Sequence, residues 1–443
     1  MNNPEVMELL KHADALHQRF GASVHDKVSE STYKLAREVA SANVSHDGRQ
    51  RFDWELRLDR LITSKFFGAI LMVALLVGIF WITITGANVP SAFLAGILIE
   101  EGGLSNWLHQ YLGVEQVPWL LSMSLYEWLH LGFSAVHAPA WLTGFLLDGM
   151  YLALAWVVAV MLPPMAIFFP LFTLAEDLGL LARIAFNLDG LLRAAGAHGK
   201  QALTMAMGFG CNAAGVISCR IIDSPRERLI AIVTNNFVPC NGRWPTLIMV
   251  SSLFVAAGFS GAGAVLVAAS AVTVVTLIGV VVTLIVSWVL SRTLLKGVAS
   301  SFTLELPPYR RPQIARVLWT SMIDRTLYVL WRAIICAAPA GALIWLLGAI
   351  SVGDQSLFVV LRGFLDPLGH LIGLDGVIVI AFIFAIPANE IVVPTIIMGY
   401  MQTTKLTEIA DPTALFTDNG WTLVTAICLL LFSLLHYPCP TPT

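Results

Sequence analysis

Residues 66–86, FFGAILMVALLVGIFWITITG, form a run without a charged side chain. An α-helix needs about 20 mostly apolar residues to cross the hydrocarbon core of a bilayer, so this run predicts a membrane span. Apolar residues make up 57% of the chain and charged residues only 12%. We therefore expect an all-α polytopic membrane protein with about seven to eight transmembrane helices. Further candidate spans are 150–172, 229–254, 264–290, 327–350, 377–401 and 421–436, with weaker apolar stretches near 117–135 and 201–218.

Residues 1–56 differ from the rest of the chain. The stretch ESTYKLAREVASA (30–42) places Leu and Ala at helical spacing among charged residues, which predicts a short soluble helix. No apolar core with a cleavage site precedes the first span, so we expect no signal peptide. Residues 66–182 contain no Lys or Arg, whereas 1–65, 183–228 and 292–332 are rich in them. The positive-inside tendency then puts the N-terminus and the basic segments in the cytoplasm, and residues 87–149 on the other side.

Two classes of function are disfavoured by composition. The net charge of −3 and the lack of a basic patch with interleaved aromatics argue against a nucleic-acid partner. The six cysteines lie singly in apolar surroundings, which is not the pattern of a secreted disulfide framework. We find no nucleophile and base pattern, no HExxH and no Gly-rich cofactor loop, so we expect neither an enzyme nor a permanently bound cofactor.

Polar residues interrupt the apolar runs at four places, in an order that recurs. MAMGFGCNAAGV (205–216) is similar to FIFAIPANEIVVP (382–394), and NNFVPCNGRWPT (235–246) is similar to LLHYPCPTPT (434–443). A Gly or Pro break inside a span frees main-chain polar groups, which at membrane depth must face protein or a water-lined cavity. Interrupted helices in internal repeats are typical of secondary transporters, with the site where the repeats meet. The sequence therefore predicts two gate-like repeats.

The breaks carry side chains that bind transition metals. We expect a metal path formed by thiols, a carboxylate and an imidazole, because a mixed sulfur, nitrogen and oxygen set suits Fe²⁺, Mn²⁺, Co²⁺ or Zn²⁺ better than Ca²⁺ or Mg²⁺. The candidate metal ligands are Cys211, Cys240, Glu390, Cys439 and His436. The candidate gate residues are Asn212, Asn241, Asn389, Pro239 and Pro387.

Each candidate also has a purely structural interpretation. A single Cys in a membrane helix is usually a packing residue, which is our interpretation of Cys219, Cys336 and Cys428. A carboxylate inside an apolar span usually marks a pathway, but Glu390 has an alternative as the ion-pair partner of Arg332. His436 has an alternative as a cap at a helix end.

The long motifs at these breaks resemble the membrane domain of the ferrous iron transport protein B family. The resemblance is carried by residues 161–192, by KQALTMAMGFGCNAAGVISCRIIDSPRERLIAIVTNNFVPCNGRWPTLI (200–248) and by IPANEIVVPTIIM (386–398), and it extends from about residue 58 to residue 439. It implies a permease of the bacterial cytoplasmic membrane that imports Fe²⁺. The family's gate cysteines fall on Cys211 and Cys240, and its later cysteine falls on Cys439. The resemblance also implies a remnant of the family's helical spacer in residues 27–42.

The chain departs from the family pattern at both ends. The family usually begins with a GTPase domain, but no GxxxxGK[ST] loop is present, and GAHGKQ (196–201) lacks the required spacing and hydroxyl. The family also continues past the late Pro-Cys into another membrane helix, whereas this sequence stops at CPTPT. We therefore expect that GTP binding, where needed, is supplied by a separate G-domain protein.

The expected organisation is a cytoplasmic helical segment (1–56), a first membrane half (57–256), a connecting helix and loop (257–326) and a shortened second membrane half (327–443). Fe²⁺ and the lipid bilayer are the expected partners, with a G-domain protein, a small accessory Feo protein or a second copy of the chain as further ones. Two other functions stay open: a transporter of nucleosides or other small solutes, and a non-transporting membrane subunit.

Overall fold

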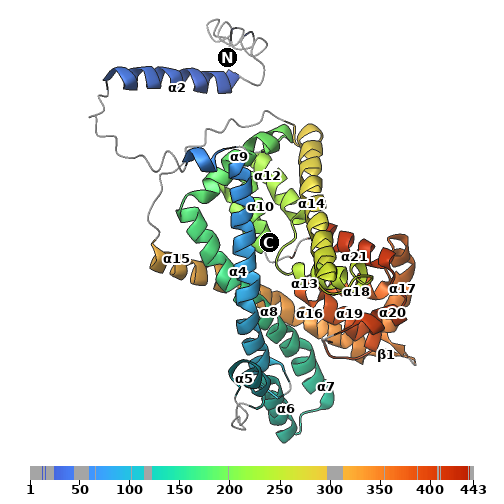
Figure 1. The fold of residues 1–443 in the computed structure, drawn as a ribbon. Helices are drawn as coiled ribbons and strands as arrows, with labels where there is room; N and C mark the ends of the chain where they lie inside the picture. Colours follow the sequence, from blue (N-terminus) through green and yellow to red (C-terminus); the bar gives the residue numbers. More distant parts are fainter. Residues whose placement is uncertain are drawn as a thin grey trace, which may run out of the picture.

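The computed structural model describes most of the membrane part of the chain (Figure 1). The described residues are 12, 15, 24–43, 59–64, 66–100, 102–113, 122–197, 199–296, 313–353, 355–386, 388–406, 409, 411–437 and 439. Within them the structure is helical apart from one small antiparallel pair of two-residue strands, in which Ser351 faces Ser356. The predicted all-α fold is confirmed.

The elements follow one another in a single chain of helices. Their bounds are α2 Val24–Asn43, α4 Phe67–Leu98, α5 Ser105–Leu112, α6 Leu125–Ala135, α7 Ala140–Thr143, η2 Gly144–Tyr151, α8 Leu152–Asp177, α9 Leu180–Ala194, α10 Lys200–Gly210, α11 Asn212–Ser218, η3 Cys219–Ile221, α12 Pro225–Thr234, η4 Asn235–Phe237, α13 Trp244–Val250, η5 Ser251–Val255, α14 Ala262–Arg292, α15 Ile314–Thr320, η6 Ser321–Leu327, α16 Tyr328–Ala349, β1 Ser351–Val352, β2 Gln355–Ser356, α17 Leu357–Leu371, α18 Gly376–Phe384, η7 Asn389–Ile391, α19 Val392–Met401, α20 Thr413–Asp418 and α21 Leu423–Leu435.

Four helical segments in the described part of the chain are long and apolar enough to cross a membrane: Val73–Leu98, Ala140–Asp177, Ala262–Arg292 and Ile314–Ala349. A fifth candidate is the pair Leu357–Leu371 and Gly376–Phe384, which is bent by 102°. This is fewer than the seven to eight predicted spans. The difference lies in 229–254, 377–401 and 421–436, where the structure has short or broken helices in place of continuous spans.

Helix α8 is the centre of the bundle and packs against α4 and α16. It is buried along much of its length although it contains Pro163, Pro164 and Pro170. The preceding π-helix η2 approaches α16 closely, because Gly149 and Gly341 meet there and a Cβ on either one would collide with the facing helix. Small residues at helix crossings allow this close packing in membrane proteins. The proline-rich centre of α8 is therefore held rigidly between two long helices.

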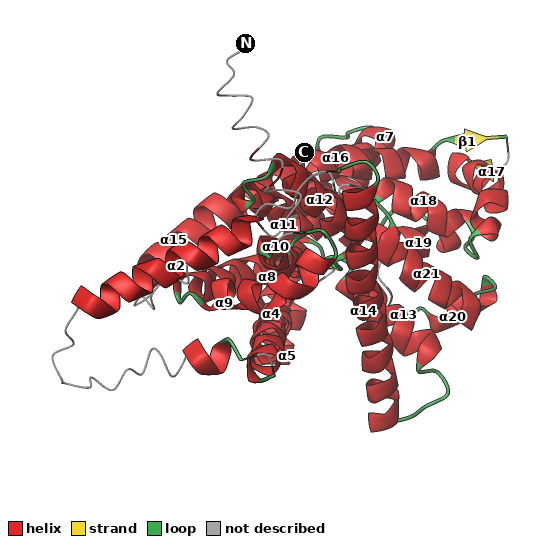
Figure 2. Ribbon diagram, turned by 90° about the horizontal axis from the view of Figure 1, so that it is seen from above, coloured by secondary structure: helices red, strands yellow, loops and turns green. Residues whose placement is uncertain are grey.

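The short and broken helices gather around this centre. Helix α21 packs against α13 and α14, and α18 packs against α17 and α19. Figure 2 shows α18, α19 and α21 together on one side of the molecule, beside α13 and α14. The described side chains of α2 are exposed, in line with the soluble helix predicted for this segment.

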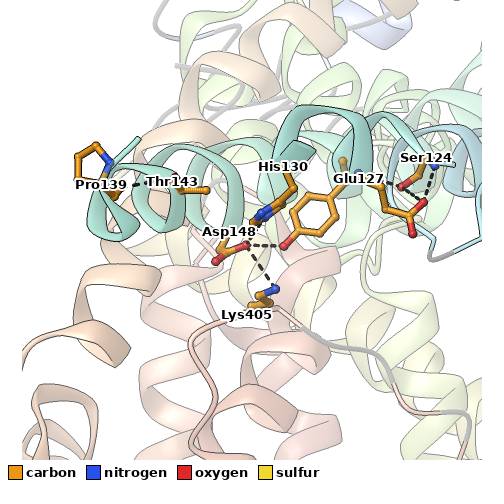
Figure 3. A network of polar contacts seen from close by, with 8 residues as sticks. Ser124, Glu127, His130, Pro139, Thr143, Asp148 and Lys405 are labelled. Carbon is orange, nitrogen blue, oxygen red and sulfur yellow. Dashed lines mark hydrogen bonds and ion pairs between the residues drawn. The ribbon is translucent and has the colours of Figure 1, made fainter. Parts of the chain in front are cut away.

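A polar network joins α6, η2 and the segment after α19 (Figure 3). Asp148 of η2 accepts a hydrogen bond from Tyr126, and its Oδ1 lies 3.2 Å from Nε2 of His130 and 3.7 Å from Nζ of Lys405. Ser124 and Glu127 form a reciprocal cap at the start of α6. The network therefore ties the first membrane half to the second through one carboxylate.

Candidate functional site

The first break separates α10 from α11 at a single residue. Cys211 has an extended backbone, with φ −147° and ψ 122°, between Gly210 and the start of α11 at Asn212. The neighbouring glycines are needed for close packing. A Cβ on Gly210 would enter the ring of Phe168, and a Cβ on Gly208 or Gly215 would meet the amide of Asn235. The motif GFGCNAAG is thus a break held tightly against α8 and η4.

The second break follows η4 and ends at α13. The chain is extended at Val238, runs through the buried Pro239 and Cys240, and enters α13 at Trp244. The main-chain N–H of Asn241 donates to the carbonyl oxygen of Gly210 over 3.1 Å. This hydrogen bond joins the first two breaks, which the sequence separates by about thirty residues.

The second half repeats both features. Ala388, with φ −154° and ψ 116°, is extended as Cys211 is, and η7 then begins at Asn389. Helix α21 ends before His436, which is extended with ψ 172° and leads toward Cys439. The predicted pairing of the motifs thus has a backbone counterpart. Pro387 lies outside the described residues.

All four breaks line one small cavity of about 30 Å³. Its walls contain four of the five predicted metal ligands, the three predicted gate asparagines, and two methionines from the proline-rich part of α8. The lining residues are Met161, Met165, Gly210, Cys211, Asn212, Ala213, Cys240, Asn241, Gly242, Asn389, Glu390 and Cys439. Residues that are far apart in the sequence therefore supply sulfur and oxygen atoms to the same space.

Asn389 connects the cavity to His436. Its amide nitrogen lies 3.9 Å from Sγ of Cys240, and its Oδ1 lies 3.1 Å from Nε2 of His436. The other ring nitrogen of His436 lies 2.8 Å from the carbonyl oxygen of Ser433. His436 is buried and does not line the cavity. The imidazole is thus placed behind Asn389, where it both orients that amide and contacts the end of α21.

Glu390 lies inside the cavity wall, against Gly242. A Cβ on Gly242 would collide with the carboxylate of Glu390, so only glycine fits here. Arg332, the alternative partner considered for Glu390, lines a separate cavity. Among the described residues, no three His, Cys, Asp or Glu side chains lie close enough to hold one ion together. The donors follow one another along the cavity and do not form a closed ligand cage.

Two features of this site were not predicted from the sequence. Arg243 is almost completely buried and donates hydrogen bonds to main-chain oxygens of Asn236, Leu434 and Tyr437. An arginine inside an apolar run was a signal that could have found it. Met161 and Met165 carry thioethers into the cavity, whereas the sequence around Met165 favoured ordinary core packing.

Comparisons with known proteins support the family resemblance. Residues 158–254 match a family model described as "Gate: Nucleoside recognition", and residues 272–325 match one described as "Ferrous iron transport protein B C terminus". A Fe(2+) transporter FeoB of Legionella pneumophila (strain Paris) is 27% identical over 86% of this chain and 48% of its own length. A Fe(2+) transporter FeoB of Staphylococcus aureus (strain COL) is 25% identical over 99% of this chain and 61% of its own length.

These findings confirm that the chain resembles the ferrous iron transport protein B family, in the C-terminal half of those proteins. The chain spans about half the length of the first curated relatives that it matches. No solved structure matches the chain significantly.

Proposed function

We propose that this chain is a membrane permease domain that passes Fe²⁺ through the cavity at the four helix breaks. The observation that carries the proposal is the lining itself. Cys211, Cys240 and Cys439 supply sulfur, Glu390 supplies a negative charge, and asparagine amides supply neutral oxygen. Ferrous iron accepts this mixed donor set, and hard cations that prefer oxygen alone do not.

The geometry suits transfer better than storage. An ion that crosses a membrane must bind well enough to shed water and weakly enough to leave. A path with donors in succession, and no three acidic, Cys or His groups converging in the described part of the chain, meets both needs. Glu390 offsets part of the cost of placing a dication in a low-dielectric space. The ion would exchange one thiol or amide for the next as it moves.

Nucleoside transport is the second candidate, because the model matched by residues 158–254 is described by nucleoside recognition. The size of the cavity favours the ion. A volume of about 30 Å³ accommodates a very few water-sized groups, whereas pockets for organic ligands are usually about 300–1,000 Å³. A nucleoside would need the four breaks to move apart.

Three parts of this proposal concern the setting of the chain. We place it in the bacterial cytoplasmic membrane with its N-terminus inside, because the basic segments predict that orientation. A GTPase acting in trans is the proposed partner where nucleotide hydrolysis is needed. A small accessory protein or a second copy of the chain can bind the same assembly. The curated names of the relatives support the iron cargo, and they are names of longer proteins.

Uptake into proteoliposomes tests the function. We expect Fe²⁺ kept reduced with ascorbate to enter vesicles that contain the wild-type chain, and Cys211→Ser and Glu390→Gln to lower the rate at least tenfold. The matched control is Cys336→Ser, which removes a thiol that does not line the cavity. Unchanged uptake in both cavity variants would refute the path, and uptake of uridine that excess Mn²⁺ leaves untouched would favour the nucleoside alternative.

A further inference from the structure

A second, larger cavity lies beside the cavity of the helix breaks. It encloses about 380 Å³ between α8, α10, α11, η3, η6 and α16. The two cavities share the wall made by the start of α11, because Ala213 lines the first and Ala214 lines the second. Nothing in the proposed ion path uses this space, yet it is the roomier of the two.

The charges in this cavity are unusual for a cation pathway. Three guanidinium groups line it, from Arg220, Arg325 and Arg332, against the two carboxylates of Glu176 and Asp324. Nη2 of Arg325 lies 3.5 Å from Glu176, and Nη1 donates to Thr173 over 2.9 Å. Within the described residues, neither Arg220 nor Arg332 forms an ion pair. Two guanidiniums therefore face the cavity with a single unpaired carboxylate, Asp324, to oppose them.

The cavity lies at the level of the membrane surface. Glu176 is one residue from the end of the membrane segment Ala140–Asp177. Arg220 belongs to the basic segment 183–228, and Arg325 and Arg332 belong to the basic segment 292–332, both of which the charge distribution places on the cytoplasmic side. The side chain of Tyr328, which also lines the cavity, is 55% exposed. Tyrosine is enriched where the hydrocarbon meets water.

The wall opposite the arginines is apolar. Phe169, Leu203, Met207 and Val329 cover it, so the cavity is amphipathic. A ligand that fits must carry an anionic group for the guanidiniums and an apolar part for this wall. Guanidinium binds phosphate oxygens through paired N–H donors, and basic pockets between transmembrane helices on the cytoplasmic side bind phospholipid headgroups.

We propose that this cavity is a binding site for the phosphate group of an anionic phospholipid, held by Arg220 and Arg332 with its glycerol and upper acyl chain against Phe169 and Val329. The site is independent of the cargo of the first cavity. A bound phosphodiester would neutralise one of the two guanidinium charges that have no ion-pair partner beside α11.

Lipid binding to the full chain tests the proposal. The purified protein is delipidated in a neutral detergent, and retention of phosphatidylglycerol or of phosphatidylcholine is measured by native mass spectrometry. We expect preferential retention of phosphatidylglycerol, and a roughly fivefold loss of its affinity for each of Arg220→Gln and Arg332→Gln. Arg332→Lys, which keeps the charge and loses the paired donors, should lie between Arg332→Gln and the wild type.

The matched control is Arg292→Gln, at the basic end of α14, where the guanidinium stacks on Trp288 outside the cavity. Wild-type affinity in the variant that combines Arg220→Gln with Arg332→Gln, or an equal loss in Arg292→Gln, overturns the site. Inorganic phosphate in excess serves as a competitor: displacement of the lipid at low phosphate concentration would show a soluble-anion site and overturn the lipid assignment. Each variant must elute from size exclusion as the wild type does, and Arg332→Lys supplies the test where the glutamine variants do not.

Discussion

Nη1 of Arg243 lies 3.0 Å from the carbonyl oxygen of Leu434, at the end of α21, almost two hundred residues further along the chain. The same nitrogen donates to the carbonyl oxygen of Asn236 over 2.8 Å. One buried guanidinium therefore fastens the second break of the first half to the last break of the second half. Main-chain oxygens freed by helix breaks need donors at membrane depth, and Arg243 supplies them.

Arg243→Lys should destabilise the protein, because an ammonium cannot reach the four main-chain and side-chain oxygens that the planar guanidinium reaches. We expect a loss of roughly 3 kcal/mol from the buried acceptors left without donors. The measurement is thermal unfolding in detergent. Arg316→Lys, at an exposed position of α15, is the control. Equal melting temperatures for the wild type and Arg243→Lys would show that the guanidinium does not hold the breaks together.

Gly242→Ala should stop transport while leaving the chain folded and inserted. The added methyl group would meet the carboxylate of Glu390, so that side chain must leave its place in the cavity. We expect Fe²⁺ uptake into vesicles to fall at least tenfold. Gly263→Ala adds the same methyl group to α14 at a position with nothing within 4 Å. Uptake that survives Gly242→Ala but not Gly263→Ala would contradict the assigned place of Glu390.

A soft divalent cation should protect one set of cysteines from alkylation. In a variant that keeps only Cys211, Cys240 and Cys439, Cd²⁺ is expected to slow maleimide labelling, because these thiols line one cavity. A second variant keeps only Cys219, Cys336 and Cys428, none of which lines it. Labelling is measured by mass spectrometry. Equal protection of both sets would remove the case for a shared thiol-lined space.

Asp148→Asn should loosen the outer part of α6. The change weakens the ion pairs with His130 and Lys405, whose side chains are 34% and 51% exposed, so we expect a cost near 1 kcal/mol (Figure 3). Faster hydrogen exchange in α6 and in residues 402–406 is the readout. Asp418→Asn, at an exposed site of α20, should leave both segments unchanged. Exchange confined to neither segment would show that Asp148 does not connect them.

Much of the site was predictable from the sequence because its chemistry departs from its surroundings. Cys211, Cys240 and Glu390 are polar or reactive residues beside helix-breaking residues within apolar runs, and that combination points inward at membrane depth. The structure places all three at one cavity. His436 carries no such signal beyond its position at a helix end, and sequence reasoning could not separate a cavity ligand from a residue that orients Asn389.

Hydropathy and motif spacing determined the helical class, the membrane setting and the pairing of Asn212 with Asn389 at corresponding breaks, because these depend on local transfer energies and backbone propensity. Tertiary structure alone decided that 229–254 and 377–401 are broken, that Arg243 joins the two halves, and that Met161 shares a cavity with Cys439. Contacts between residues hundreds of positions apart depend on how whole helices pack. No local pattern encodes which faces will meet.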